Sequence, residues 1–222
     1  SGIDLALWDI AGKARGEPVH RLLGASYRKR VKAYASTLMP DTPGEAFRKA
    51  ERLRQQGFLS MKFGWGPIGA SMALDRELFR AVRDGAGPDS EIMIDAGQRY
   101  SLRDARRAAD VLAEIGAGWL EEPLDPDDLS GYARLSRTRP VPIAAGEAES
   151  GLPAFRRLIE EGMVDIVQPD LSRAGGLTLA RKIAELAARN GRRTIPHAFK
   201  SNILLSASLH FCAATKSADL LE

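Results

Sequence analysis

Gly118-Trp119-Leu120-Glu121-Glu122-Pro123 is the stretch of sequence that decides the fold. A short apolar run ends in two acidic residues, and a proline then ends the strand. Asp95, 26 residues before Glu121, closes a similar run, and Glu147, 26 residues after Glu121, closes another. In a parallel barrel such strand ends meet at one spot, where three carboxylates repel one another unless a hard cation neutralises them. The pattern therefore predicts a divalent metal site.

The rest of the chain repeats this strand-plus-helix unit. A helix over 2–23, interrupted by Gly16 and Pro18, comes first. Strands are then predicted over 31–36, 60–65, 91–96, 119–122, 143–147, 165–170, 194–197 and 218–222. Helices are predicted over 43–57, 71–85, 102–116, 128–137, 151–162, 176–191 and 201–215. This α/β order predicts a (β/α)7β barrel, one helix short of a complete (β/α)8 barrel. An open doubly wound sheet is the alternative, but no glycine fingerprint follows the first strand.

Composition indicates an ordinary globular chain. Of its 222 residues 44% are hydrophobic and 27% charged, with a net charge of only +3. The one basic cluster, Tyr27-Arg28-Lys29-Arg30 with Lys32, is short, so we interpret it as a solvated loop and expect no nucleic-acid partner. The single cysteine, Cys212, suits a reducing compartment such as the cytoplasm. No stretch reads as a membrane span or signal peptide, and neither end reads as a natural terminus, so we expect a fragment.

Ionisable residues stand at the ends of seven consecutive predicted strands. They are Lys62, Asp95, Glu121 or Glu122, Glu147, Asp170, His197 and Glu222. Charges in a barrel mouth cost desolvation energy, so packing does not explain such a series. We therefore predict an active site at the carboxyl ends of the strands.

The residue types indicate one chemistry. Three monodentate carboxylates suit Mg²⁺, and zinc is disfavoured because Cys212 lies in a predicted helix, out of register. N-capping of the following helices is the alternative role for the acids. Asp170 beside His197 would fix the imidazole tautomer and raise its basicity, giving a general base. A base, a metal and Lys62 opposite them suit removal of the proton α to a carboxylate, with stabilisation of the enediolate.

These residues also carry a resemblance to a known family. The chain resembles the mandelate racemase and muconate lactonizing group of the enolase superfamily over nearly all of its length. The segments that carry it are Gly2-Ile3-Asp4-Leu5-Ala6-Leu7-Trp8-Asp9-Ile10-Ala11-Gly12-Lys13, Asp95, Trp119-Leu120-Glu121-Glu122-Pro123, Gly146-Glu147, Pro169-Asp170 with Gly175-Gly176, Pro196-His197 and Leu221-Glu222.

The resemblance assigns roles to these positions. It selects Glu121 over Glu122 as the metal ligand, beside Asp95 and Glu147, and makes Glu222 the residue that hydrogen-bonds the substrate carboxylate. It implies that residues 1–25 link to an N-terminal α+β capping domain absent from this chain, and that residues 26–222 form the catalytic barrel. It also implies a homo-oligomer. Trp65, Gln98 and Lys200 are candidate pocket linings; packing is the alternative role for Trp65 and Gln98, and a solvated helix start is the alternative for Lys200.

Two departures from the family pattern bear on the reaction. The family's Lys-X-Lys motif reads Lys62-Phe63-Gly64 here, so the second base is missing. Asp95-Ala96-Gly97 stands where the family often has Asp-X-Asn. A one-base site suits dehydration of a sugar acid to a 2-keto-3-deoxy acid, with His197 as base and Lys62 binding the carboxylate. A racemase, epimerase or cycloisomerase of the same superfamily, or a non-catalytic metal-binding barrel, are the alternatives.

Overall fold

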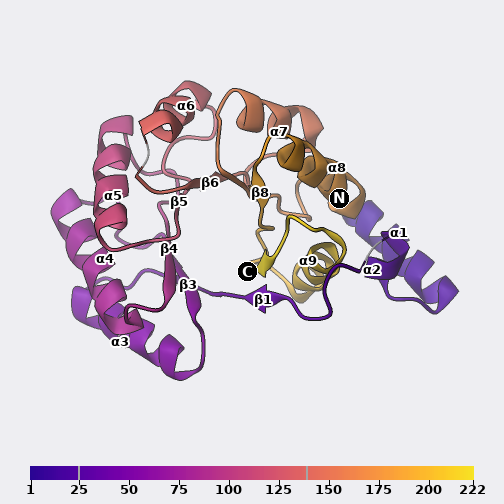
Figure 1. The fold of residues 1–222 in the computed structure, drawn as a ribbon, viewed down its shortest axis with the longest axis horizontal. Coiled ribbons are helices and arrows are strands. Elements are labelled where there is room, and N and C mark those ends of the chain that lie inside the picture. The colour runs from indigo at the N-terminus through magenta and orange to yellow at the C-terminus, as the bar shows by residue number, and fades with distance from the viewer. Residues whose placement is uncertain (25, 139) are drawn as a thin grey trace. The chain divides into compact units, whose positions relative to one another are not determined.

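The computed structural model describes residues 1–24, 26–138 and 140–222, and the chain divides into two units. Unit 1 comprises residues 1–33 and 145–222, and unit 2 comprises residues 34–144. Strands alternate with helices in each unit, as the sequence predicts (Figure 1).

Unit 2 is built on parallel strands in the order β2-β3-β4-β5-β6. The strands are β2 (Ala35–Leu38), β3 (Ser60–Gly64), β4 (Glu91–Asp95), β5 (Trp119–Glu121) and β6 (Ile143–Ala145), whose last residue belongs to unit 1. The helices are α3 (Pro43–Gln55), α4 (Met72–Ala86), α5 (Leu102–Glu114) and α6 (Leu129–Thr138). Figure 1 shows α3, α4 and α5 along one side of β3, β4 and β5, so that each crossover covers the same face of these strands.

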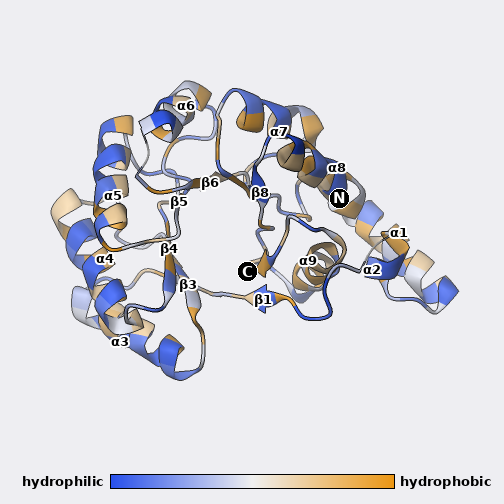
Figure 2. Ribbon diagram, in the orientation of Figure 1, coloured by the Kyte–Doolittle hydropathy of each residue, from blue (hydrophilic) through white to orange (hydrophobic). Residues whose placement is uncertain are grey.

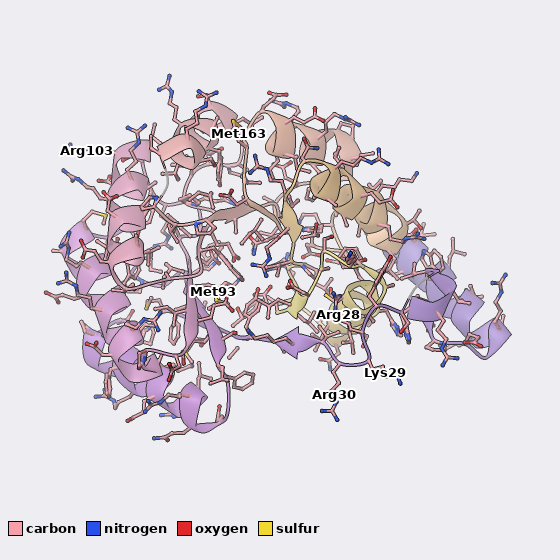
Figure 3. All side chains as sticks on the ribbon, viewed as in Figure 1. Arg28, Lys29, Arg30, Met93, Arg103 and Met163 are labelled. Carbon is pink, nitrogen blue, oxygen red and sulfur yellow. The ribbon has the colours of Figure 1, made fainter. Side chains whose placement is uncertain are left out.

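Hydroxyl side chains begin three of the helices of unit 2, α3, α4 and α5. Thr42, Ser71 and Ser101 each accept a hydrogen bond from the backbone N–H three residues on, at α3, α4 and α5. The buried stripe of each helix faces the strands, while polar residues such as Arg103 point outward (Figures 2 and 3). Among the described residues, no helix is both long enough and apolar enough to cross a bilayer.

Unit 1 combines the two ends of the chain. Its helices are α1 (Gly2–Arg15), α2 (Val19–Leu22), α7 (Gly151–Glu160), α8 (Gly176–Arg189) and α9 (Asn202–Ala214). Its strands are β1 (Lys32–Ala33), β7 (Ile166–Val167), β8 (Arg193–Thr194) and β9 (Leu220–Leu221). β7 pairs with β8 and β1 pairs with β9, both in parallel.

The core of unit 1 lies between α8, α9 and the adjoining strand ends, and it includes Leu177, Ala180, Phe211 and Leu221. Cys212 belongs to this core, as its predicted helical position implies. Burial raises the pKa of the Cys212 thiol to about 12, so the thiol stays protonated and unreactive at neutral pH.

The first predicted strand, over 31–36, is two strands in the structure. β1 hydrogen-bonds to β9 through Lys32 and Ala33, whereas β2 hydrogen-bonds to β3. Tyr34 stands between them and packs edge-on against the ring of Trp119. The two halves separate because β1 pairs with β9, whereas β2 pairs with β3.

The strands that carry the predicted dyad are shorter than predicted. β7 stops at Val167 and β8 at Thr194, and the pairing resumes only as a single bridge between Asp170 and His197. Pro169 and Pro196 lie in the two gaps, and proline has no N–H to donate to a ladder.

The predicted helix over 2–23 is broken where Gly16 and Pro18 interrupt it. Gly16 ends α1 in a left-handed conformation, and Pro18 stands at the N-cap of α2. Trp8 in α1 donates to the hydroxyl of Thr178 in α8, so this segment packs within unit 1. The predicted domain boundary falls at residue 25, which lies outside the described residues, and the division into 1–25 and 26–222 stays a prediction.

The basic cluster is not wholly a solvated loop. The Arg28 guanidinium donates to the carbonyls of Cys212, Thr215, Lys216 and Ala218, which end α9 and lead into β9. Arg30 extends away from the chain (Figure 3). The interpretation was wrong for Arg28, because free carbonyls at a helix end attract a cation.

Candidate active site

The strand register of unit 2 forms two rows of side chains on one face of the sheet. Gly64, Asp95 and Glu121 are register partners at the carboxyl ends of β3, β4 and β5. Lys62, Met93 (labelled in Figure 3) and Trp119 form the row below. Residues two apart on a strand share a face, so both rows point the same way.

Asp95 is held by the turn that follows β4. It is only 5% exposed. Its Oδ1 accepts from the backbone N–H of Gly97 at 2.8 Å, and its Oδ2 accepts from Trp65 Nε1 at 3.0 Å. Gly97 is left-handed, and a Cβ there would lie 3.1 Å from the Trp65 ring. The Asp-Ala-Gly departure therefore makes room for an indole.

Glu121 is fully buried and bonded at both oxygens. Lys62 Nζ lies 2.5 Å from Oε1, and Trp119 Nε1 donates to Oε2 at 2.9 Å. Lys62 also lies 5.7 Å from the centre of the Tyr34 ring. The four-carbon stem lets Lys62 reach from the lower row to the upper one, where its charge balances that of the buried carboxylate.

Glu122 follows a different path from Glu121. It is also buried, but its φ of 36° is left-handed, and its Oε2 accepts from Gln98 Nε2 at 2.5 Å. Glu121, not Glu122, is the register partner of Asp95. Glu121 therefore stands beside Asp95 at the strand ends, and its role as a metal ligand stays a prediction.

The second group of predicted residues lies within unit 1, around His197. His197 Nδ1 is 3.0 Å from Asp170 Oδ2, and Nε2 is 3.1 Å from Glu147 Oε2. Glu222 Oε2 lies 3.9 Å from the same Nε2 and accepts from the backbone N–H of Ala198. The carboxylates of Glu147, Asp170 and Glu222 therefore surround one imidazole. In the sequence they are spread over 76 positions, from 147 to 222.

Asp170 is fixed as a carboxylate. Burial alone would raise its pKa, but hydrogen bonds from His197 and from the hydroxyl and backbone N–H of Ser172 outweigh it, and the net pKa is lowered. An ionised Asp170 accepts the Nδ1–H of His197 and leaves Nε2 as the basic atom.

The acids do not cap helices. Ser101 caps α5, and Ser150 stands at the N-cap of α7, so neither Asp95 nor Glu147 takes that place. This removes the simplest structural explanation for carboxylates at these strand ends.

Gly64 is required by the packing of Asp95. A Cβ at Gly64 would lie 2.6 Å from Asp95 Cβ and 3.0 Å from Asp95 Oδ2. The side chain of Asp95 thus fills the space that a residue at position 64 would need, and this site is built for glycine there.

We expect Gly64→Ala to lower the free energy of unfolding by about 1–3 kcal/mol, because overpacking displaces Asp95. Mg²⁺ affinity should fall with it. Urea denaturation and calorimetric Mg²⁺ titration measure the two effects. Gly2→Ala, where a Cβ meets nothing within 4 Å, is the control. If the two variants behave alike, the steric account is wrong.

The contacts of Trp65, Gln98 and Trp119 add to the predicted set. Trp65 and Gln98 were expected only as pocket linings, and Lys200 is exposed next to the N-cap of α9. Trp119 was noted only as part of the strand motif and was given no role in the site. Its position two residues before Glu121 on one strand was the available signal, because that spacing puts both on one face.

The comparisons with known proteins place the chain in a family. Residues 45–222 match the family described as enolase C-terminal domain-like, and residues 1–24 match the mandelate racemase / muconate lactonizing enzyme N-terminal domain. The chain therefore belongs to the mandelate racemase and muconate lactonizing group of the enolase superfamily.

Two curated relatives cover nearly the whole chain. The D-galactarolactone cycloisomerase of Agrobacterium fabrum is 39% identical, over 96% of this chain and 57% of its own length. The L-rhamnonate dehydratase of Saccharopolyspora erythraea is 38% identical, over 89% of this chain and 50% of its own length. The chain thus spans about half the length of these relatives.

A solved structure supports the fold class. The mandelate racemase/muconate lactonizing protein from Paracoccus denitrificans, complexed with magnesium, matches with a TM-score of 0.91 and 30% identity, over 99% of this chain and 62% of that one. The predicted α/β barrel class, that of the family's C-terminal domain, is confirmed.

Proposed function

We propose that this member of the family takes part in Mg²⁺-dependent removal of the proton α to the carboxylate of a sugar acid, leading to dehydration to a 2-keto-3-deoxy acid. The observation that carries the proposal is His197, with Nδ1 on an ionised Asp170 and Nε2 directed at carboxylates. The two curated relatives, a dehydratase and a cycloisomerase of acid-sugar compounds, support the substrate class.

The residues fit a hard divalent cation. Asp95 and Glu121 are buried carboxylates in adjacent register positions, and each has one oxygen oriented by an indole N–H. All of the donors are oxygen, which is what Mg²⁺ prefers. We propose that Asp95, Glu121 and Glu147 hold Mg²⁺, as the family resemblance implies. The ion would supply positive charge that acidifies the α-proton and stabilises the enediolate.

The steps then follow from the residues. His197 Nε2 takes the α-proton, and Asp170 stabilises the imidazolium that results. Glu222, in its protonated form, donates a hydrogen bond to the substrate carboxylate. Lys62, whose ammonium lies in the row of Asp95 and Glu121, offsets the charge of the enediolate. The enediolate expels the β-hydroxyl, which takes the proton from His197 and leaves as water. The enol product tautomerises to the 2-keto-3-deoxy acid.

Gly64 favours this one-base route. Because Asp95 fills the space beside Gly64, no second base stands at that position. Cycloisomerisation is the second candidate, since a relative with 39% identity is named for it. We further propose a cytoplasmic homo-oligomer that acts on a small carboxylate and binds neither nucleic acid nor membrane.

The test is the full-length protein with Mg²⁺, incubated in D₂O with a library of aldonic and aldaric acids. We expect a 2-keto-3-deoxy product from at least one of them. Deuterium exchange into substrate without water loss would contradict dehydration and favour cycloisomerisation or epimerisation. Metal binding with neither result would favour a non-catalytic barrel.

A further inference from the structure

The proposed mechanism leaves Trp65 without a role, although it is the residue directly after β3. The residue is 43% exposed, and its φ is 58°. Among the described residues, the non-glycine residues with left-handed φ are Trp65, Gln98, Glu122 and Met163. The first three follow the carboxyl ends of β3, β4 and β5. Such unfavourable conformations gather at functional sites, where the surroundings enforce them.

Trp65 is tied to Asp95 in three ways. Its backbone N–H donates to the Asp95 carbonyl at 3.1 Å, and its Nε1 donates to Asp95 Oδ2 at 3.0 Å. Its ring lies against Gly97, the residue whose N–H holds the other oxygen of Asp95. The indole plane and the carboxylate are therefore fixed together.

Further bonds lock the two loops that carry Trp65 and Gly97. Asp75, which is fully buried, accepts from the backbone N–H of Gly69 in the first loop and from the hydroxyl of Tyr100 in the second. Arg99 donates to the carbonyl of Gly66. The conformation of Trp65 is thus over-determined by its surroundings, which explains how its left-handed backbone persists.

We propose that Trp65 is a positioning residue for Asp95 and that the exposed face of its indole stacks on the carbon chain of the sugar acid. The inference rests on the proposed function. An indole face is electron-rich, and the C–H groups of a polyhydroxy acid carry partial positive charge next to their hydroxyls. An aromatic face beside a metal-binding carboxylate can orient such a chain, as the few fixed groups of a pocket usually do.

The positioning role is tested by Mg²⁺ titration calorimetry of the full-length protein. Trp65→Phe keeps a ring but loses the N–H, and we expect the Kd for Mg²⁺ to rise about 10-fold, the lower end of the range for lost outer-shell partners. Trp8→Phe, which removes an N–H bonded to a hydroxyl, should leave the Kd unchanged. The melting temperatures of the two variants, measured alongside, should match each other. If Trp65→Phe binds Mg²⁺ as tightly as wild type, the positioning role is overturned.

The stacking role is tested by sugar-acid binding in a His197→Asn background, which stops turnover. Galactarate and L-rhamnonate at saturating Mg²⁺ serve as probes. Trp65→Phe should bind the sugar acids within about twofold of the His197→Asn parent. Trp65→Asn should bind them about 10-fold more weakly, although asparagine tolerates the left-handed backbone at this position. If both variants bind the sugar acids equally well, or if the His197→Asn parent binds neither, the stacking role is overturned. If the wild type binds a sugar acid but forms no product, only the proposed dehydration is refuted.

Discussion

Replacing His197 with asparagine in the full-length protein is expected to lower kcat/KM by about 10²–10⁴-fold, the range that a positioned general base contributes. The reason is the pairing of Nδ1 with Asp170, which directs Nε2 to the site. Asparagine can still bond to Asp170 but cannot accept the α-proton. Turnover is followed by 2-keto-3-deoxy product, and proton abstraction by loss of the α-proton signal in D₂O.

His210→Asn is the matched control for this prediction. His210 lies in α9 and stacks on His20, with ring centres 5.6 Å apart and no contact to Asp170. We expect near-wild-type turnover from it. A His197→Asn enzyme that still dehydrates substrate at the wild-type rate would remove His197 from the mechanism.

Replacing Lys62 with methionine is expected to lower the free energy of unfolding by about 3–5 kcal/mol, the cost of leaving a buried charge without its partner. Glu121 is fully buried, and Lys62 lies 2.5 Å from it. Methionine has a similar length and no charge, so packing changes little. The loss should be smaller with saturating Mg²⁺ if Glu121 is a ligand. Urea denaturation with and without Mg²⁺ measures both values.

Two further variants show how the stability loss of Lys62→Met is to be interpreted. Arg80→Met breaks an ion pair with Glu114 whose side chains are both about half exposed, and it should cost no more than about 1 kcal/mol. The double variant with Lys62→Met and Glu121→Gln should recover most of the lost stability, because it removes the uncompensated charge. If Lys62→Met and Arg80→Met cost the same, the buried pair does not stabilise the fold.

Periodicity and strand-end chemistry were enough to predict most elements of the fold. Apolar runs that end in Asp95 or Glu121 are strands, and most of the predicted helix ranges contain a helix, as 102–116 contains α5 behind its cap Ser101. These features are local, since alternation and capping depend on neighbours a few residues apart. The approach of His197 to Asp170 followed from the same logic, because adjacent strands were expected to end side by side.

Side-chain reach and backbone strain could not be predicted in this way. The contact of Lys62 with Glu121 was not predicted, because it depends on a side-chain stem long enough to span the two rows. The left-handed conformations of Trp65, Gln98 and Glu122 have no sequence signal, since none is a glycine. The first strand divides because its halves pair with different neighbours, which depends on contacts distant in sequence.

The bonds of Arg28 bear on the order in which unit 1 folds. They join residues 184 to 190 positions apart, and β1 pairs with β9 over a similar span. Contacts so distant in sequence close large loops, which makes them slow and late to form. Glu222 directly follows β9, so the predicted substrate contact becomes ordered only after residues 28–33 have met residues 212–221.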